Sequence, residues 1–222
     1  MEKKEFTLET FERIINKVVF WNSLAGNLPE DRGLEKIYLQ LSREEFFGQN
    51  EFLQGWFTGD KVMQADGVGD LLFTAGMLSR IVNDTQIIFK PSELNQLVVI
   101  EVVKHLSGDL INWAESVYDS LFGLCYKMSE VMDVESIFEV IYQSNMSKYV
   151  HVDNLYGGFC LDGEVQAIEA KGRYAGVDYR RVGDYYVFTA FRDLESGVEF
   201  DKPKIVKSSL FKEVEGLEDF IY

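Results

Sequence analysis

The sequence predicts a mainly helical protein that carries a small antiparallel sheet near its C-terminus. Apolar side chains recur at helical spacing through the first two thirds of the chain, whereas apolar and polar side chains alternate in segments after residue 178. Only three prolines and no low-complexity tracts occur in the 222 residues, so we expect no long linkers. We therefore expect a helical bundle over residues 1–153 and a small α+β extension over residues 154–222.

The first expected helix illustrates how the helical segments are identified. Phe11, Ile14 and Val18 follow the i, i+3, i+4 rule, and Thr7 can cap the helix before its first turn. The segment Ala-Gly-Asn-Leu-Pro at 25–29 then breaks the pattern. The same criteria predict helices over residues 8–22, 34–57, 61–82, 91–105, 108–128, 133–146 and 163–173.

The expected sheet follows from β-rich segments in the last third of the chain. Residues 178–181, 185–191 and 204–207 alternate or are rich in β-branched and aromatic side chains. Val182-Gly183-Asp184 supplies a turn between the first two segments. We therefore expect a small antiparallel sheet that is added to the helical bundle.

The net charge of −15 limits the partners of this chain. No basic patch is evident, so we expect no nucleic-acid partner. No run of 18 apolar residues and no apolar signal segment occur, so we expect no membrane association and a cytoplasmic location. Two cysteines without metal-ligand spacing fit that reducing compartment. A ligand with phosphates would need divalent cations to offset the acidity.

Five carboxylates are the main candidates for chemistry. The apolar stripe that begins at Leu34 and Tyr38 is expected to continue inward along its helix, but acidic residues and Gly48 occupy its later positions. Bare burial of a carboxylate is costly, so such residues need a partner. The following helix carries two further acids, four residues apart and on one face. The five candidates are Glu44, Glu45, Glu51, Asp66 and Asp70.

The chemistry that suits these acids is divalent metal binding. Mg²⁺ prefers hard oxygen ligands, and the turn at Thr58-Gly59-Asp60 makes the two acidic helices antiparallel neighbours. Bound ions can then clamp a triphosphate and activate a water molecule. A plainer interpretation also stands, in which Glu44 and Glu45 are solvated and Asp66 and Asp70 merely favour the early part of a helix through its dipole.

Three stretches resemble the MazG-like nucleotide pyrophosphohydrolases, an all-α superfamily. The first runs from Asn50-Glu51-Phe52-Leu53-Gln54 to Asp66-Gly67-Val68-Gly69-Asp70, and resembles the family's central helix pair with its EExxE block and its second acidic block. The second, Ser144-Asn145-Met146-Ser147-Lys148, and the third, Arg181-Val182-Gly183-Asp184-Tyr185-Tyr186-Val187, are similar to segments of the bacterial and phage members with a C-terminal extension. The resemblance covers roughly residues 10–210.

The resemblance implies a fold, a reaction and a set of residue roles. The fold would be an all-α pyrophosphohydrolase-like bundle with a small C-terminal β appendage. The reaction would be Mg²⁺-dependent cleavage of a nucleoside triphosphate between its α and β phosphates, with Mn²⁺ as a substitute for Mg²⁺. Glu51, Asp66 and Asp70 would hold metal, and Asn145 and Lys148 would meet the phosphates. Members usually form homodimers or homotetramers, and the apolar segment 94–103 could supply the interface.

One departure from the family pattern concerns the leading pair of glutamates. Aligned through Glu51, that pair falls on Phe47 and Gly48, while Glu44 and Glu45 lie one turn earlier. Either Glu44 acts from the same face, with Glu44 or Glu45 completing the metal shell and serving as the catalytic base, or the site is partly dismantled. The second reading predicts a nucleotide-binding or regulatory protein that has lost turnover. A third hypothesis, an interaction module without a nucleotide, is disfavoured by the 144–148 segment.

Trp21 and Asn22 are candidates for contact with a nucleobase. They end the first helix, where the indole could stack on a base and the amide could hydrogen-bond to it. A half-buried core Trp is at least as good an interpretation of the same position. We therefore list both residues as substrate-binding candidates beside Asn145 and Lys148.

Overall fold

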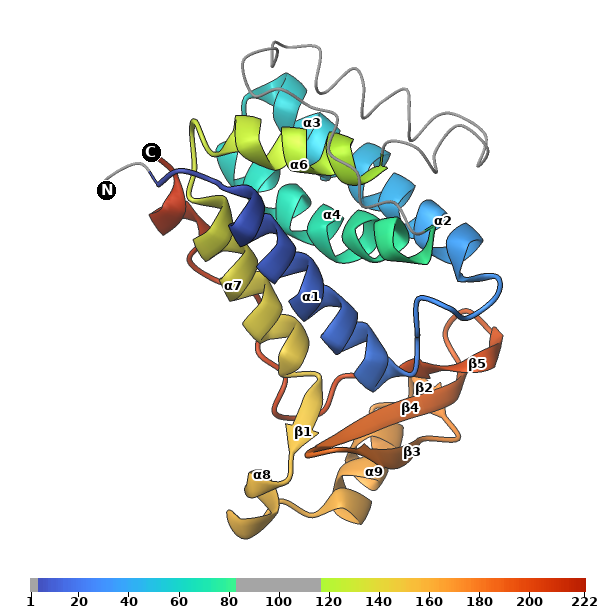
Figure 1. The fold of residues 1–222 in the computed structure, drawn as a ribbon. Coiled ribbons are helices and arrows are strands. Elements are labelled where there is room, and N and C mark those ends of the chain that lie inside the picture. Colours follow the sequence, from blue (N-terminus) through green and yellow to red (C-terminus); the bar gives the residue numbers. More distant parts are fainter. Residues whose placement is uncertain (1–3, 83–116) are drawn as a thin grey trace. The chain divides into compact units, whose positions relative to one another are not determined.

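A computed structural model describes residues 4–82 and 117–222, and these residues divide between two compact units (Figure 1). The first unit comprises Met1–Ile141 together with Glu215–Tyr222, and the second comprises Tyr142–Val214. The mainly helical class with a small antiparallel sheet near the C-terminus is confirmed. The division lies before the boundary expected at residues 153 and 154, and the chain returns to the first unit at its C-terminal end.

The first unit is built around α4, which spans Lys61–Ile81 and contacts α1, α2, α3, α6 and η3. Most of its residues from Gln64 onward are buried. This agrees with its composition, because a helix that is apolar nearly all round is expected in the centre of a bundle. The elements of this unit are α1 (Leu8–Ala25), α2 (Leu34–Phe47), α3 (Phe52–Thr58), α4, α6 (Val117–Met128), α7 (Val134–Met146, whose end enters the second unit) and η3 (Leu217–Phe220).

Helices α1 and α4 begin at side-chain caps that the sequence provides. The hydroxyl of Thr7 accepts from the backbone N–H of Thr10 at 3.2 Å, and Gly26 ends α1 in the left-handed region at φ 78°. Asp60 caps α4 by accepting from the backbone N–H groups of Val62 and Met63, each at 3.0 Å. The observed bounds of α1, α4 and α7 confirm, within a few residues at their ends, the helices expected over residues 8–22, 61–82 and 133–146.

The single helix expected over residues 34–57 is wrong. The chain leaves the helical region at Gly48, which has a ψ of 169°, and turns at Asn50, which has a φ of 66°. Asn tolerates that left-handed conformation better than most residues. Two helices, α2 and α3, therefore replace one. The helix expected over residues 91–105, the interface expected at 94–103 and the start of the helix expected over 108–128 lie outside the described residues.

Aromatic side chains fill the core of the first unit. Phe11 lies edge-on to Tyr118, with ring centroids 4.9 Å apart, and lies 5.5 Å from Phe122. Phe73 of α4 stacks on Phe138 of α7 at 5.5 Å. Each fully buried ring stabilises the fold by roughly 1.5–3 kcal/mol relative to an exposed one, so these rings hold α1, α4, α6 and α7 together.

The C-terminal segment packs on the loop before α7. Met132 and Ile221 form an isolated antiparallel bridge. The backbone N–H of Asp133 donates to the carbonyl of Phe220 at 2.8 Å, and the backbone N–H of Tyr222 donates to the carbonyl of Val131 at 2.9 Å. Residues 215–222 therefore belong to the helical unit in structure, although they follow the sheet in sequence.

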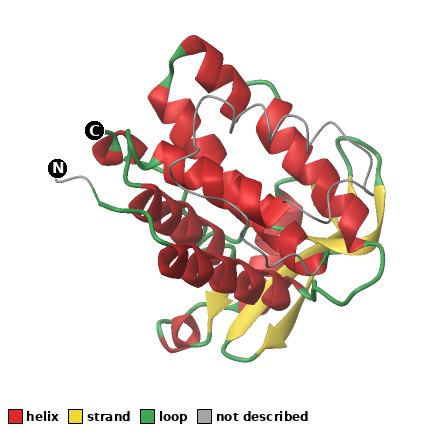
Figure 2. Ribbon diagram, turned by 45° about the horizontal axis from the view of Figure 1, so that its top comes forward, coloured by secondary structure: helices red, strands yellow, loops and turns green. Residues whose placement is uncertain are grey.

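The second unit contains a five-stranded antiparallel sheet, whose strands are yellow in Figure 2. Strands β1, β2, β3 and β5 all pair with β4. The register pairs Tyr179 with Phe188, and Thr189 with Ile205. Helix α9 supplies Ile168 to the core formed by the inner face of the sheet. The elements are β1 (Tyr149–His151), α8 (Asp153–Tyr156), α9 (Leu161–Ala170), β2 (Tyr174–Ala175), β3 (Asp178–Val182), β4 (Tyr185–Asp193) and β5 (Glu199–Ile205).

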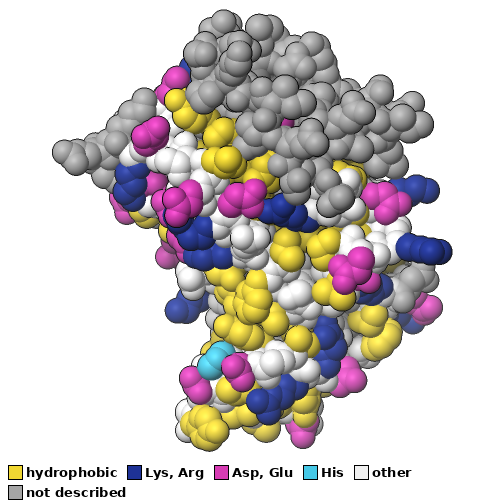
Figure 3. All heavy atoms as spheres, viewed as in Figure 1, with side chains coloured by type: hydrophobic (Ala, Val, Ile, Leu, Met, Phe, Trp, Pro, Cys, Tyr) yellow, Lys and Arg dark blue, Asp and Glu magenta, His cyan; other side chains and the backbone are white. Residues whose placement is uncertain are grey.

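The excess negative charge belongs to one unit. The second unit has ten Lys and Arg against eleven Asp and Glu, whereas the rest of the chain has twelve against 26. On the face shown in Figure 3, basic and acidic side chains are interspersed and form no single basic surface. In the part of the chain that the structure describes, no helix has the length and apolar composition needed to cross a membrane.

Candidate metal site

Glu51 and Asp66 are the two candidate acids that the structure brings together. Glu51 is the N-cap residue of α3, and Asp66 lies in the second turn of α4. Desolvation raises the pKa of the Glu51 carboxyl, and the nearby charge of Asp66 raises it further. Desolvation also raises the pKa of Asp66. Within residues 4–82 and 117–222, neither carboxylate has a hydrogen-bond donor or a cation against it. The pair is therefore an uncompensated concentration of negative charge.

Close packing of α3 on α4 explains why these two acids meet. A Cβ atom at Gly67 of α4 would lie 2.7 Å from the N, Cα and Cβ atoms of Phe52. At the other end of the same contact, a Cβ atom at Gly55 of α3 would lie 2.9 Å from the backbone N of Gln64. Asp66 and Glu51 are the chain neighbours of Gly67 and Phe52, so the approach of the two backbones brings the acids together.

The end of α2 gives the Glu51 side chain its place. A Cβ atom at Gly48 would lie 2.7 Å from Cγ of Glu51 and 2.3 Å from the carbonyl oxygen of Glu44. Gly48 closes α2 by donating its backbone N–H to that carbonyl at 2.8 Å. Because Gly48 has no side chain, the stem of Glu51 can fold back over the end of α2.

Glu44 lies outside this pair, on the exposed side of α2. The inward line of α2 carries Ser42 and Phe46, so the expectation that Glu44 lies on that line is wrong. Glu44 is exposed and accepts from the side chain of Gln40 at 2.9 Å. Glu45 and Asp70 are half-buried, and each takes part in an interaction within the fold. The helix therefore turns Glu44 away from the line that simple continuation of the stripe predicts.

The chemistry of the donors decides whether Mg²⁺ fits here. Among the described residues, no group of three or more His, Cys, Asp or Glu side chains could hold a metal ion. Mg²⁺ is commonly held by only one or two carboxylates, with waters and substrate phosphates as its remaining ligands. Glu51 and Asp66 supply two hard oxygen donors with unbalanced charge. The pair therefore fits an ion that a phosphate-bearing ligand helps to hold, and does not fit a cage made by the protein alone.

Asn22 and Trp21 are engaged in the core of the first unit. Asn22 is 1% exposed; its side chain donates to the carbonyl of Val18 at 2.9 Å and accepts from the hydroxyl of Tyr38. Trp21 is half-buried and lies edge-on to Phe73, with ring centroids 5.6 Å apart. Both side chains therefore join α1 to its neighbours.

Asn145 and Lys148 contact each other at the end of α7. The ammonium of Lys148 donates to Oδ1 of Asn145 at 2.6 Å, and both side chains are half-buried. Both residues belong to the second unit, whereas the candidate acids belong to the first. The structure thus fixes a cation beside an amide, which is a combination suited to an anionic ligand.

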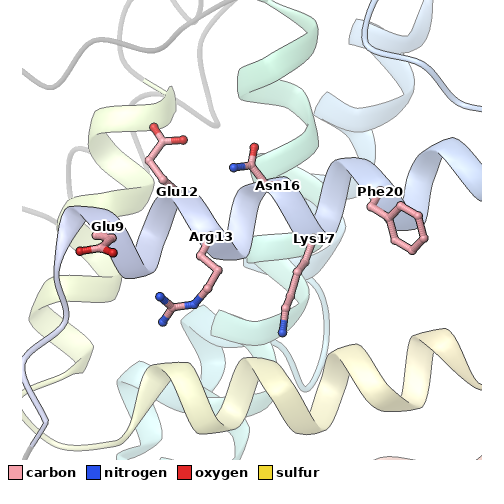
Figure 4. A pocket seen from close by; sticks show the side chains of 6 residues that line it. All are labelled: Glu9, Glu12, Arg13, Asn16, Lys17 and Phe20. Carbon is pink, nitrogen blue, oxygen red and sulfur yellow. The ribbon is translucent and has the colours of Figure 1, made fainter.

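A groove of about 550 Å³ runs along α1 in the first unit (Figure 4). Arg13 and Lys17 point toward α7 and form ion pairs there with Glu135 and Glu139. These cations serve to hold α1 against α7, and the groove contains none of the candidate acids. The described residues that line it are Glu9, Glu12, Arg13, Asn16, Lys17 and Phe20.

The glycines of this site were not among the residues expected from the sequence. Gly48, Gly55 and Gly67 interrupt helical patterns, and such a position commonly signals close packing. That signal was available in the sequence, but the partner of each glycine follows only from the three-dimensional contact.

Comparison of the chain with models of protein families, with curated proteins and with solved structures found no match.

Proposed function

We propose that this protein is a Mg²⁺-dependent nucleotide pyrophosphohydrolase, which cleaves a nucleoside triphosphate between its α and β phosphates. The observation that carries the proposal is the carboxylate pair Glu51 and Asp66. Desolvation raises the pKa of both carboxyls and the charge of Asp66 raises that of Glu51 further, so the pair has a deficit of positive charge. A bound divalent cation would remove that deficit. The resemblance of residues 50–70 to the acidic blocks of the MazG-like enzymes supports the choice of reaction.

In this proposal each residue has a defined task. Glu51 and Asp66 bind the cation through carboxylate oxygens. The cation, when bound, offsets the phosphate charge and polarises the bond that breaks. Asp70, which the described structure does not gather with the pair into a group of three acids, remains the third ligand that the resemblance implies. Glu45, which is half-buried at the end of α2, is the proposed base for the attacking water. Asn145 and Lys148 remain the residues predicted to meet phosphate.

A second candidate is a protein of the same fold that binds a nucleotide without turning it over. The exposure of Glu44 favours it, because a solvated carboxylate on the outer side of α2 offers little to a shared metal shell. The lack of a group of three acids within the described residues favours it as well. The two candidates share the cation-binding pair and differ only in the supply of a base.

The proposal extends to the setting in which the protein acts. We propose a homodimer or homotetramer in the cytoplasm of a bacterium or of a phage-infected host, with no nucleic-acid or membrane partner. Light scattering after size-exclusion chromatography tests the oligomer, and a single monomeric species would contradict it.

A pyrophosphate-release assay tests the proposed reaction. The purified protein is incubated with each nucleoside triphosphate and Mg²⁺, and the same reactions are run with Glu51→Gln, Asp66→Asn and, as a control, Glu30→Gln at an exposed position. The expected result is release of pyrophosphate that the control retains and the two site variants lose. Absence of product with every nucleotide, together with Mg²⁺-dependent thermal stabilisation by one of them, would replace the enzyme by the binding protein.

A further inference from the structure

Gly67 and Gly76 of α4 both approach other helices closely, but they meet different kinds of atoms. A Cβ atom at Gly67 would lie 2.7 Å from the N, Cα and Cβ atoms of Phe52, which belong to or adjoin the backbone of α3. A Cβ atom at Gly76 would lie 2.7 Å from Cδ1 of Ile15, which is the end of a flexible side chain. Alanine at position 76 can therefore be accommodated by a rotation of Ile15, whereas alanine at position 67 requires α3 to move.

From this contrast we infer that Gly67 is a positioning residue, which sets the separation of the Glu51 and Asp66 carboxylates by letting the start of α3 lie directly on α4. The inference deepens the proposed function and rests on it. Glu51 immediately precedes Phe52, so a shift of Phe52 carries Glu51 with it. Asp66 immediately precedes Gly67 and stays with α4. Any displacement at this contact therefore changes the distance between the two acids.

Helix propensity argues against a purely local reason for glycine at this position. Glycine is less favourable than alanine in the interior of a helix, and Gly67 lies well inside α4. Gly67 does not have a positive φ, so it does not adopt the left-handed backbone conformation that would require glycine. What alanine would disturb is the space against Phe52. Gly48 contributes from the other side, because a Cβ atom there would lie 2.7 Å from Cγ of Glu51.

The test compares Gly67→Ala with Gly76→Ala in the full chain. Binding of Mn²⁺ alone is measured by electron paramagnetic resonance, and turnover is measured as kcat and as the apparent KM for Mg²⁺. Circular dichroism and chromatographic elution establish that each variant is folded. If Gly67→Ala does not fold, Gly48→Ala takes its place. A Cβ atom there would lie 2.3 Å from the carbonyl oxygen of Glu44 and 2.7 Å from Cγ of Glu51, so the change shifts Glu51 and the end of α2 and leaves α4 unaltered.

We expect Gly67→Ala to lose Mn²⁺ affinity by about 10- to 100-fold, as changes to groups that orient metal ligands do, while Gly76→Ala binds as the wild type does. The apparent KM for Mg²⁺ should rise in step with that loss. If the wild type binds Mn²⁺ and turns over nucleotide, but Gly67→Ala or Gly48→Ala binds equally well, the positioning role is overturned and the proposed function stands. If the wild type neither binds Mn²⁺ nor releases pyrophosphate, the proposed function fails and the positioning role fails with it.

Discussion

The hydroxyl of Tyr38 in α2 donates a hydrogen bond to Oδ1 of Asn22 at the end of α1, and both side chains are buried. Asn27 in the intervening loop donates to the same hydroxyl at 3.2 Å. Desolvation raises the pKa of Tyr38 to about 12, against the smaller lowering effect of the bond from Asn27. The neutral phenol is therefore a fixed part of the connection between the first two helices.

Tyr38→Phe should lower the free energy of unfolding by about 1–3 kcal/mol, because it leaves the buried Oδ1 of Asn22 without this donor. Urea denaturation measures the change. Tyr156→Phe removes the same hydroxyl from a side chain that is 90% exposed, and its effect should stay within about 0.5 kcal/mol. Equal effects of the two changes would mean that the Tyr38 bond contributes nothing.

Asp133 should make the first unit sensitive to acid. Burial alone would raise its pKa, but hydrogen bonds from Lys4 and Ser136 and the charge of Lys4 together hold the pKa below its usual range. Because the folded-state pKa is lowered, the ionised Asp133 carboxylate contributes stability above its unfolded-state pKa of about 3.9. That contribution is lost as the pH falls through the folded-state pKa.

Asp133→Asn keeps an N-capping side chain but removes the charge. The wild type should therefore exceed this variant in stability above about pH 5, and the difference should shrink below about pH 4. Urea denaturation at a series of pH values measures the difference. A constant difference across that range would show that the charge of Asp133 is not its cause.

Glu51→Gln should stabilise the metal-free protein at neutral pH. A raised carboxyl pKa means that the ionised form is disfavoured in the fold, so the penalty is absent below the unfolded-state pKa and grows as the pH rises through the folded-state pKa. In a chelator at pH 7 we expect the Tm to rise by roughly 1–4 °C. The gain should vanish near pH 4, and exposed Glu30→Gln should show no such pH-dependent gain. A Tm that falls at pH 7 would contradict the repulsion.

Asp70→Asn tests the third proposed ligand. Asp70 lies one turn after Asp66 on α4, and the resemblance to the MazG-like family predicts that it binds the same ion. We expect pyrophosphate release to fall by about 100-fold or more, with the far-ultraviolet circular dichroism unchanged. Unchanged kinetics in this variant would remove Asp70 from the site and leave the pair alone.

Glu164 anchors the end of the second unit to α9. It is 7% exposed and accepts from the backbone N–H of Ser209 at 2.6 Å and from its hydroxyl at 2.7 Å. Glu164→Ala should lower stability by about 1–3 kcal/mol, because both donors lose their acceptor. Hydrogen exchange should quicken within residues 142–214 in this variant and not in Gln166→Ala, which alters an exposed position on the same helix.

The sequence could predict the elements whose signals are local. Thr7 and Asp60 mark helix starts through their own side chains, and Gly183 lies at φ 57° in the turn between β3 and β4, as its neighbours indicate. The break between α2 and α3 also had a local signal in Gly48 and Asn50, but the apolar spacing outweighed it. Strand β1 was missed because its three residues pair only with the distant strand β4.

The candidate site was predictable in composition and not in geometry. Residue type and spacing placed Glu51 and Asp66 on neighbouring helices, and the structure brings them together. Which acids of α2 face the core depends on how the helix is rotated about its axis. The buried side of α2 carries Ser42 and Phe46, so Glu44 faces solvent and not the core as the apolar stripe predicts. The burial of Asn22 depends on Tyr38, sixteen residues away, and no local pattern reports that pairing.

The return of Glu215–Tyr222 to the first unit constrains the order of events during protein synthesis. A ribosome completes residues 142–214 before it makes the segment whose Phe220 and Ile221 pair with the chain beside Met132 and Asp133. The sheet can therefore fold during translation while the older helical unit still lacks one of its own parts. Stalling a nascent chain between residues 214 and 222 would hold the helices in that unfinished condition, so the N-terminal helices reach their final stability only after the chain beyond residue 214 has been made.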